Sequence, residues 1–255
     1  MILEYHRPTD LQDALRLLSR SMPLTKPLAG GTHLLRERVA PYAVVDLQAL
    51  GLDQVTDSGQ TLDIGAACRL QALYEHGRIP AAIKQMLQRE YSNNQRNAGT
   101  LGGLIMSADG RSAALTCLSA CDALLTWEPE TKSIRLGEWL VSRGKINPGR
   151  LLTSISIPVD VRLGVEIISR TPKDLPILAV AVAQWKKGRT RLVVGGFGAF
   201  PSLAMDGSTS SGATAAARNA CAEAGDAWGS AEYRTEMAAV LAERILSGLE
   251  KRGGQ

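Results

Sequence analysis

The sequence predicts an α+β protein in two parts, with mixed helices and strands over residues 1–158 and an antiparallel sheet with helices over residues 159–255. Before Pro158, stretches with helical spacing of apolar residues alternate with short β-rich runs. After it, three β-rich runs are separated only by turn residues, and a long amphipathic helix follows. We therefore place a domain boundary at residue 158.

Length and composition favour a globular protein. A chain of 255 residues with 45% apolar residues can bury a substantial core. It has no apolar run of about 18 residues, and its first ten residues lack the apolar segment of a signal peptide, so we expect a cytoplasmic protein without a transmembrane segment. Because the 29 basic residues are scattered among 25 acidic ones and aromatic residues make up only 4%, we do not expect nucleic-acid binding.

The first part of the chain opens with a helix. The segment Thr9–Gln12 has the form of a capping box, and apolar residues at helical spacing after it predict a helix over about 10–20. Residues 26–31 predict a short strand that runs into a glycine turn. Residues 42–50 and 61–70 each predict a strand followed by a turn.

The next ninety residues alternate between helical and extended patterns. They are expected to form helical structure at 70–90, a polar loop at 91–100, a helix passing into a strand at 111–125, a strand and short helix at 131–140, and a half-buried strand at 149–160.

The last part is predicted to begin as an antiparallel meander, with β-rich runs at 165–171, 177–188 and 191–200. Residues 207–225 are rich in Ser, Gly and Ala and predict a loop and a small helix. A terminal helix follows from Ser230. We expect its apolar stripe to pack in the core or at an interface; the stripe consists of Tyr233, Met237, Val240, Leu241 and Ile245.

The four cysteines, Cys68, Cys117, Cys121 and Cys221, lie among apolar neighbours and are interpreted as buried thiols. Cys117 and Cys121 would share one face of a helix and in principle offer two metal ligands. No further Cys or His is close in sequence, so we predict core packing and no metal site.

Two glycine pairs are candidate ligand-binding segments. One lies in the segment Lys26–His33 (KPLAGGTH) and the other in Thr100–Gly103 (TLGG). Adjacent glycines let a bulky anion approach the backbone, so their N–H groups can point at phosphate oxygens, and a diphosphate is the natural ligand. Either pair alone is also ordinary turn chemistry. The chain has neither the phosphate loop of kinases nor the Gly-x-Gly-x-x-Gly motif of dinucleotide-binding folds, which disfavours a kinase or an NAD dehydrogenase.

The order of motifs resembles the FAD-binding medium subunit of the molybdenum hydroxylases, the family of carbon monoxide dehydrogenase and xanthine dehydrogenase. The matching segments, in order, are EYHRPTDLQDALRLL, PLAGGTHLL, VVDLQAL, RNAGTLGG, LLTSISIP, SRTPKDLPILAVAVA, GGFGAFP and GSAEYRTEMAAVLAERIL. The resemblance implies a two-part α/β FAD-binding domain of the PCMH type over 1–158 and the C-terminal domain of a medium subunit over 159–255.

The resemblance also implies which residues hold the cofactor. In relatives, the segment matching Lys26–His33 wraps the FAD diphosphate, and the segment matching Thr100–Gly103 closes on it from the other side. The implied cofactor-binding residues are Lys26, Pro27, Leu28, Ala29, Gly30, Gly31, Thr32, His33, Thr100, Leu101, Gly102, Gly103, Leu104, Asp109 and Leu152. No catalytic residue is implied.

The chain departs from the family pattern at a few positions. Leu104 stands where the family usually has Asn, and the family's flavin-contacting Asp falls on Ala113, with Asp109 as a candidate replacement one helical turn earlier. Val165 and Ile167 stand where relatives often carry Tyr and Lys near the flavin ring. These losses would weaken FAD binding unless other groups replace the missing contacts.

As a family member, this chain would be an electron-transfer subunit of an oxidoreductase. A large partner would hold the molybdenum cofactor and a small partner the [2Fe-2S] clusters, and FAD in this chain would pass electrons to an acceptor. The cysteines here lack ferredoxin spacing, in keeping with clusters on another chain. The alternative is a non-enzymatic scaffold subunit of the same fold in which flavin binding is weakened or lost.

Overall fold

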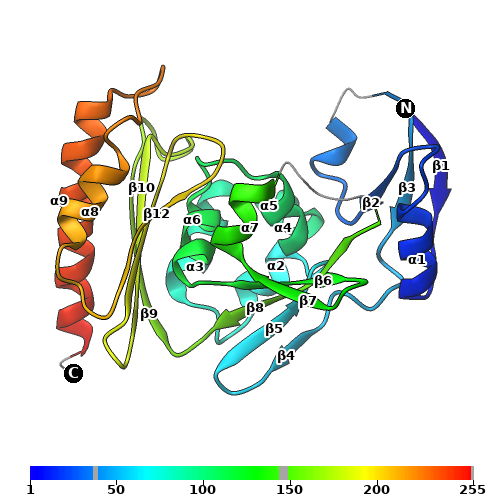
Figure 1. Cartoon of the computed structure of the whole chain (residues 1–255), viewed down its shortest axis with the longest axis horizontal. Helices are drawn as coiled ribbons and strands as arrows, with labels where there is room; N and C mark the ends of the chain where they lie inside the picture. Colours follow the sequence, from blue (N-terminus) through cyan, green and yellow to red (C-terminus); the bar gives the residue numbers. More distant parts are fainter. Residues whose placement is uncertain (37–39, 144–148, 254–255) are drawn as a thin grey trace. The chain divides into compact units, whose positions relative to one another are not determined.

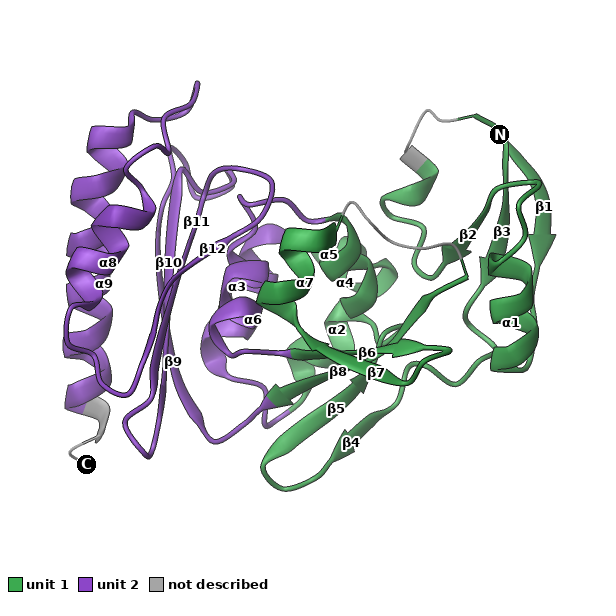
Figure 2. Ribbon diagram, viewed as in Figure 1, with its two compact units in different colours: residues 1–76, 92–107, 124–157 green, residues 77–91, 108–123, 158–255 purple. Residues whose placement is uncertain are grey.

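The computed structural model describes residues 1–36, 40–143 and 149–253, and the chain divides into two compact units (Figure 2). Each unit is assembled from separate stretches of chain. Unit 1 consists of Met1–His76, Ser92–Ser107 and Leu124–Ile157, and unit 2 of Gly77–Tyr91, Ala108–Ala123 and Pro158–Gln255. The chain passes into unit 2 for the last time at Pro158, but two earlier segments already belong to that unit.

Unit 1 begins with a small parallel sheet in the order β1-β3-β2 (Figure 1). Its strands are β1 (Ile2–His6), β2 (Thr25–Leu28) and β3 (Tyr42–Asp46). Helix α1 (Leu11–Leu18) buries Ala14, Leu17 and Leu18 in a cluster with Val45 of β3. Burial of this apolar stripe attaches the helix to the sheet.

The start of α1 is predicted correctly, but its cap is not. The side chain of Asp10 accepts the N–H of Asp13 at 2.8 Å, and the helix begins at Leu11. Asp10 therefore performs the capping that the Thr9–Gln12 pattern assigned to Thr9.

The second sheet of unit 1 has five strands in the order β4-β5-β8-β6-β7. The pairs β4/β5, β6/β7 and β6/β8 are antiparallel. In chain order the strands are β4 (Val55–Asp57), β5 (Thr61–Gly65), β6 (Leu124–Glu128), β7 (Lys132–Arg135) and β8 (Leu151–Pro158). The helices of this part are α2 (Leu70–Glu75), α4 (Asn93–Ala98), α5 (Leu101–Ser107) and α7 (Leu136–Ser142).

The polar loop predicted at 91–100 is wrong, because most of it forms α4. Ser92 accepts the N–H of Gln95, and the Gln95 side chain accepts the N–H of Ser92, so the two residues form a capping box. The helix ends before Gly99, and α5 starts two residues later. This short α4–α5 connection carries the second glycine pair.

Unit 2 is built on a four-stranded antiparallel sheet in the order β12-β11-β10-β9. Its strands are β9 (Val161–Ile168), β10 (Leu178–Trp185), β11 (Thr190–Gly195) and β12 (Ser202–Gly207). Helices α8 (Ala213–Ala220) and α9 (Ala231–Gly253) cover one face of the sheet, and α3 (Ala81–Glu90) and α6 (Ala113–Ala120) cover the other (Figure 1). The predicted meander is confirmed, with β12 as an additional strand.

The terminal helix buries a slightly different stripe from the predicted one. Leu241 and Ile245 belong to the core that α9 forms with β10, but the side chain of Tyr233 is 45% exposed. The fully buried residue in this turn is Arg234, whose guanidinium donates to the carbonyl of Ile177 and to Asp226. Its hydrogen bonds make burial of the charge tolerable.

All four cysteines are free and buried, as predicted. Burial raises the pKa of the Cys68 thiol to about 11 and that of Cys121 to about 12, so neither is a ready thiolate. Within the described residues, His, Cys, Asp and Glu side chains form no cluster of three that would suit a metal ion. Within the same residues, no helix combines the length and apolarity needed to cross a membrane.

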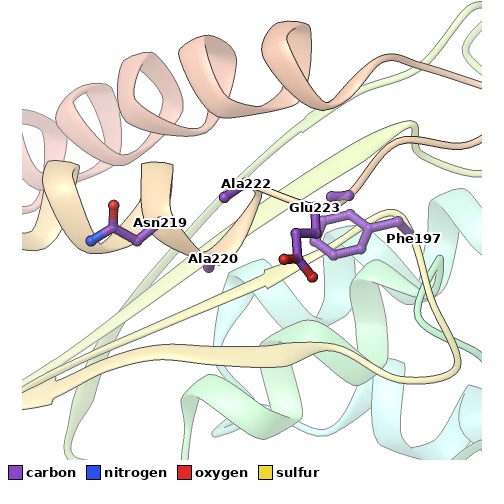
Figure 3. A pocket seen from close by; sticks show the side chains of 6 residues that line it. Phe197, Asn219, Ala220, Ala222 and Glu223 are labelled. Carbon is purple, nitrogen blue, oxygen red and sulfur yellow. The ribbon is translucent and has the colours of Figure 1, made fainter.

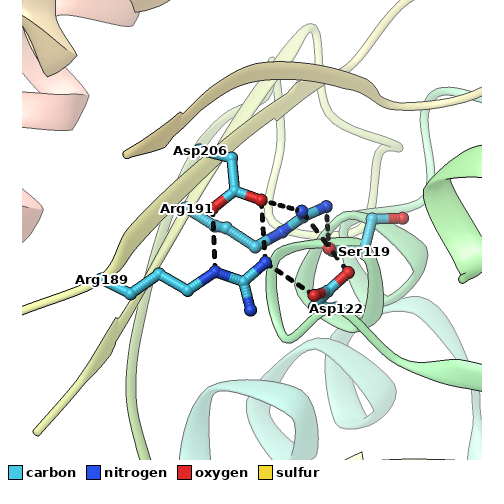
Figure 4. A network of polar contacts seen from close by, with 5 residues as sticks. All are labelled: Ser119, Asp122, Arg189, Arg191 and Asp206. Atoms are coloured by element: carbon cyan, nitrogen blue, oxygen red, sulfur yellow. Dashed lines mark hydrogen bonds and ion pairs between the residues drawn. The ribbon is translucent and has the colours of Figure 1, made fainter. Parts of the chain in front are cut away.

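A buried ion network ties α6 to the edge of the unit 2 sheet (Figure 4). Asp122, in the turn after α6, lies 2.7 Å from Nη2 of Arg189 and 3.4 Å from Nη1 of Arg191. The same two arginines bind Asp206 of β12 at 2.8 Å and 2.6 Å, and the hydrogen bond from Arg189 helps to hold the pKa of Asp206 below its ordinary value. The side chains of Asp122 and Arg191 are 3% and 6% exposed, so these two buried charges depend on the network for their counter-charges.

We predict that Asp122→Asn lowers the free energy of unfolding by about 1–3 kcal/mol, because Arg189 and Arg191 then lose one of the two carboxylates that they share and keep only Asp206. Asn suits this position because it tolerates the residue's φ of 58°. Urea unfolding measures the loss. The control is Asp160→Asn, which breaks an exposed pair with Lys186 and should change stability by less than about 1 kcal/mol. Equal losses in the two variants would contradict the assignment.

Candidate functional site

The first glycine turn follows β2 at the carboxyl end of the parallel sheet, where ligands bind in open α/β folds. Gly31 has a φ of +68°. Its carbonyl accepts the N–H of Leu35, which lies in a short 3₁₀ helix, η1 (Leu34–Arg36). The N–H groups of Gly30, Gly31 and Thr32 have no acceptor within the described residues. Three neighbouring amides are thus open to an anion.

The residues just before the second glycine segment pack directly against this turn. A Cβ placed on Gly30 would lie 2.0 Å from the carbonyl oxygen of Ala98 and 3.2 Å from the Cα of Gly99. A residue with a side chain therefore cannot replace Gly30 unless the backbone moves. Since Ala98 and Gly99 lead into Thr100–Gly103, the first glycine turn lies close to the second segment within unit 1, as a shared diphosphate site requires.

The N–H groups of the second segment are mostly used inside the protein. The N–H of Leu101 donates to Cys68 O at 2.9 Å, and that of Gly102 donates to Ala66 O at 2.8 Å. These bonds tie the start of α5 to the connection between β5 and α2. The prediction that the N–H groups of this glycine pair point at a phosphate is therefore wrong: that of Gly102 donates to Ala66, and that of Gly103 donates to the Thr100 hydroxyl at 3.1 Å.

The two glycines of this segment have different surroundings. A Cβ on Gly102 would lie 2.7 Å from the carbonyl oxygen of Ala66, so this glycine permits close packing. Gly103 is exposed, and its Cβ would meet only the Thr100 hydroxyl, at 3.0 Å, which also accepts the Gly103 N–H at 3.1 Å. Gly103 therefore leaves a bare backbone surface at the start of α5.

The other residues of the first segment lie along β2 and its turn. Lys26, Pro27 and Leu28 belong to β2, Ala29 follows it, and His33 is exposed. The Lys26 Nζ lies 5.4 Å from the ring centroid of Tyr42.

One residue near the turn carries no signal in the sequence. Arg69, just before α2, donates from Nη1 to the carbonyl oxygen of Ala98. The two residues are 29 positions apart, and no motif links them, so only the folded chain reveals the contact. The oxygen of Ala98 is the same one that packs against Gly30.

Comparison with known proteins identifies the family. Residues 1–160 match the family model described as the FAD binding domain in molybdopterin dehydrogenase. The chain belongs to this family. It is 30% identical to the carbon monoxide dehydrogenase medium chain of Afipia carboxidovorans, covering 98% of this chain and 97% of that one. It is also 34% identical to the uncharacterized Escherichia coli protein YgfM over 77% of this chain and 75% of that protein.

Solved structures agree with the family assignment. A Cu,Mo-CO dehydrogenase structure in its cyanide-inactivated form contains a chain that superposes with a TM-score of 0.82. It is 26% identical to this protein and covers 99% of both chains. The expected α+β fold and the recognition of an FAD-binding domain of this family are therefore confirmed.

Two of the implied cofactor-binding residues lie in the interior of this protein. Leu104 is 3% exposed on α5, and Leu152 of β8, which pairs with Trp127 of β6, is 4% exposed. In unit 2, Ala113 is fully buried at the start of α6. Asp109 is exposed in unit 2, where it accepts the N–H of Arg111, and its part in a flavin site stays a proposal.

The buried carboxylate of Glu90 caps the amino end of α6. Glu90 accepts the N–H of Ala114 and the hydroxyl of Ser112, both at 2.8 Å. Burial raises the pKa of Glu90 to about 7 despite these bonds. The amino end of α6 is therefore capped from within unit 2.

A cavity of about 350 Å³ in unit 2 offers an unsuitable lining for a diphosphate (Figure 3). It lies between the loop after β11 and the end of α8. Phe197, Asn219 and Glu223 line it together with three alanines. Its one charged group is a carboxylate, which would repel phosphate, so the glycine turns remain the better site.

Glu90 should make stability depend on pH. Because its folded pKa is raised from 4.5 to about 7, its contribution is fully present below pH 4.5 and is lost as pH rises through 7. At 1.36 kcal/mol per unit, the loss is about 3 kcal/mol. Chemical unfolding between pH 4.5 and 7.5 should show a shallower decline for Glu90→Gln than for wild type. The exposed variant Glu250→Gln should keep the wild-type slope; identical slopes for all three proteins would contradict the prediction.

Proposed function

We propose that this chain is the FAD-binding electron-transfer subunit of a molybdenum hydroxylase complex. The observation that carries the proposal is the set of open N–H groups at Gly30, Gly31 and Thr32, in a turn packed against Ala98 and Gly99 just before the second glycine segment. Family membership supplies the cofactor, because this family is one of FAD-binding domains. The open N–H groups supply a site for the diphosphate, the most highly charged part of FAD.

In this proposal the residues divide the binding between them. The amides of residues 30–32 donate to diphosphate oxygens, and Gly103 lets the diphosphate approach the start of α5. Leu152 is the implied flavin contact, but it is only 4% exposed and offers little surface of its own. When bound, FAD supplies the redox chemistry, and the protein binds, orients and shields it. No side chain of this chain is required as an acid or a base.

We infer that the chain works with other subunits. The relative from Afipia carboxidovorans is named as the medium chain of a dehydrogenase, which supports a partner with the molybdenum cofactor and one with [2Fe-2S] clusters. The four cysteines of this chain are free and buried, so the clusters are assigned to a partner. We assign the complex to the cytoplasm and propose residues 1–158 and 159–255 as its functional domains.

A scaffold subunit with lost flavin is the second candidate. It is favoured by Leu104 and Ala113, because both side chains are buried and offer no polar contact where relatives have one. A charge-assisted hydrogen bond contributes about 1.5–3 kcal/mol, so two such losses would weaken FAD by orders of magnitude.

The visible spectrum of the purified full chain, followed by titration with FAD, separates the two candidates. Bound flavin in one-to-one ratio supports the electron-transfer subunit. A colourless protein that ignores added FAD supports the scaffold. Co-purified partners would then be analysed for molybdenum and iron.

We predict that Gly103→Val weakens FAD binding at least about tenfold, because the new side chain stands where the diphosphate approaches. The fold should tolerate the change, since Val is a better helix former than Gly and the Cβ meets only the Thr100 hydroxyl. Calorimetric titration gives the affinity. The control is Gly77→Ala, where a Cβ meets nothing within 4 Å. Unchanged affinity in folded Gly103→Val would remove Gly103 from the site.

A further inference from the structure

Given the proposed function, we propose that Arg69 is the cation that neutralises the FAD diphosphate and so selects a dinucleotide flavin over a flavin without a diphosphate. The position of Arg69 follows from one atom, the carbonyl oxygen of Ala98. The Ala98 carbonyl oxygen contacts the backbone of Gly30 and also accepts an N–H from Arg69. The guanidinium therefore lies beside the turn whose amides are open.

The backbone of Arg69 is fixed by the second glycine segment. Arg69 forms an isolated antiparallel bridge with Thr100, and the next residue, Leu70, donates its N–H to Gly99 O at 3.0 Å. The side chain thus starts from a backbone position that is paired with Thr100 and reaches back to Ala98. The backbone and the guanidinium of Arg69 are therefore both positioned by contacts with residues 98–100.

The charge of Arg69 has no counter-ion within the described residues. Its guanidinium makes one hydrogen bond there, to the neutral carbonyl of Ala98, and the other N–H groups have no acceptor in that part of the chain. The residue is nevertheless half-buried. A partly desolvated cation is costly without an anion, so the position favours a bound anionic group.

Three other described cations of unit 1 already have partners. Arg20 binds Glu4 at 2.8 Å, Arg150 binds Glu130 at 3.0 Å, and Lys26 lies over the ring of Tyr42. Arg69 differs because it combines proximity to the open amides with unused donors. A guanidinium presents these donors as a planar fork that matches phosphate oxygens, which an ammonium group does not.

The consequence is selectivity for the diphosphate. The amides of the turn contribute partial charges, whereas Arg69 contributes a full one. A flavin that lacks the diphosphate gains nothing from this charge. FAD and ADP should therefore depend on Arg69, and riboflavin should not.

The test compares Arg69→Gln with wild type in the full-length chain. Calorimetric titrations with FAD and ADP should show affinities lowered by about tenfold to a hundredfold, with riboflavin unchanged. The affinity of wild type for ADP should also fall more steeply with added salt than that of the variant, because one charge contact is missing. Arg16→Gln is the matched control, since it removes an equal charge from an exposed pair on α1.

The outcomes are separable. If wild type binds FAD and Arg69→Gln binds FAD and ADP equally well, the role of Arg69 is overturned while the proposed function stands. An equal loss of FAD, ADP and riboflavin would assign Arg69 a structural role and also overturn it. Failure of wild type to bind FAD would overturn the proposed function and this inference together.

Arg69→Lys covers the case in which the Gln variant does not fold. Lys keeps the charge but loses the fork, so affinity for FAD and ADP should fall by less than in the Gln variant, with the salt dependence retained. Circular dichroism and thermal unfolding verify that each variant is folded. Wild-type affinity for both ligands in Arg69→Lys, joined to a wild-type affinity insensitive to salt, would overturn the proposal.

Discussion

The candidate site depends on one backbone contact, in which the missing side chain of Gly30 makes room for the carbonyl oxygen of Ala98. This contact joins the turn after a parallel strand to the connection between α4 and α5. Neither segment could bind a diphosphate firmly alone, because a single glycine turn presents few donors and has no opposing wall. Their junction fixes where the open amides of the first turn point. It also places the carbonyl oxygen of Ala98, which accepts a hydrogen bond from Arg69, beside the turn.

The four glycines of the two pairs have distinct physical roles, which the sequence alone does not distinguish. Gly30 and Gly102 are needed inside the protein, because a Cβ on either would enter a carbonyl oxygen. Gly31 takes a left-handed conformation, and Gly103 leaves the helix start bare. A substitution at Gly30 therefore reports on folding, whereas one at Gly103 reports on ligand approach. The distinction decides which variants test a cofactor site.

Much of the fold could be predicted from periodic apolar residues, including α6, the meander of unit 2 and the terminal helix. The failures have physical causes. The helix α4 was hidden because Ser92 and Gln95 cap a sequence with almost no apolar residues. The strand β12 was missed because its residues are mostly half-exposed. Arg69 could not be found because its contact is made across 29 residues, and the burial of Leu104 appears only once the chain is folded.

The burial of Leu104 and Ala113 changes where the cofactor's binding energy must come from. With hydrophobic side chains inside the protein at both positions, neither residue offers a polar contact to the flavin. What remains for the ring is apolar surface, which favours binding without fixing orientation. The diphosphate end, with open amides and a guanidinium lacking a counter-ion, then supplies most of the directional interactions. A subunit of this kind would hold FAD chiefly by its diphosphate, so its affinity would depend on ionic strength more than that of a relative with polar contacts to the ring.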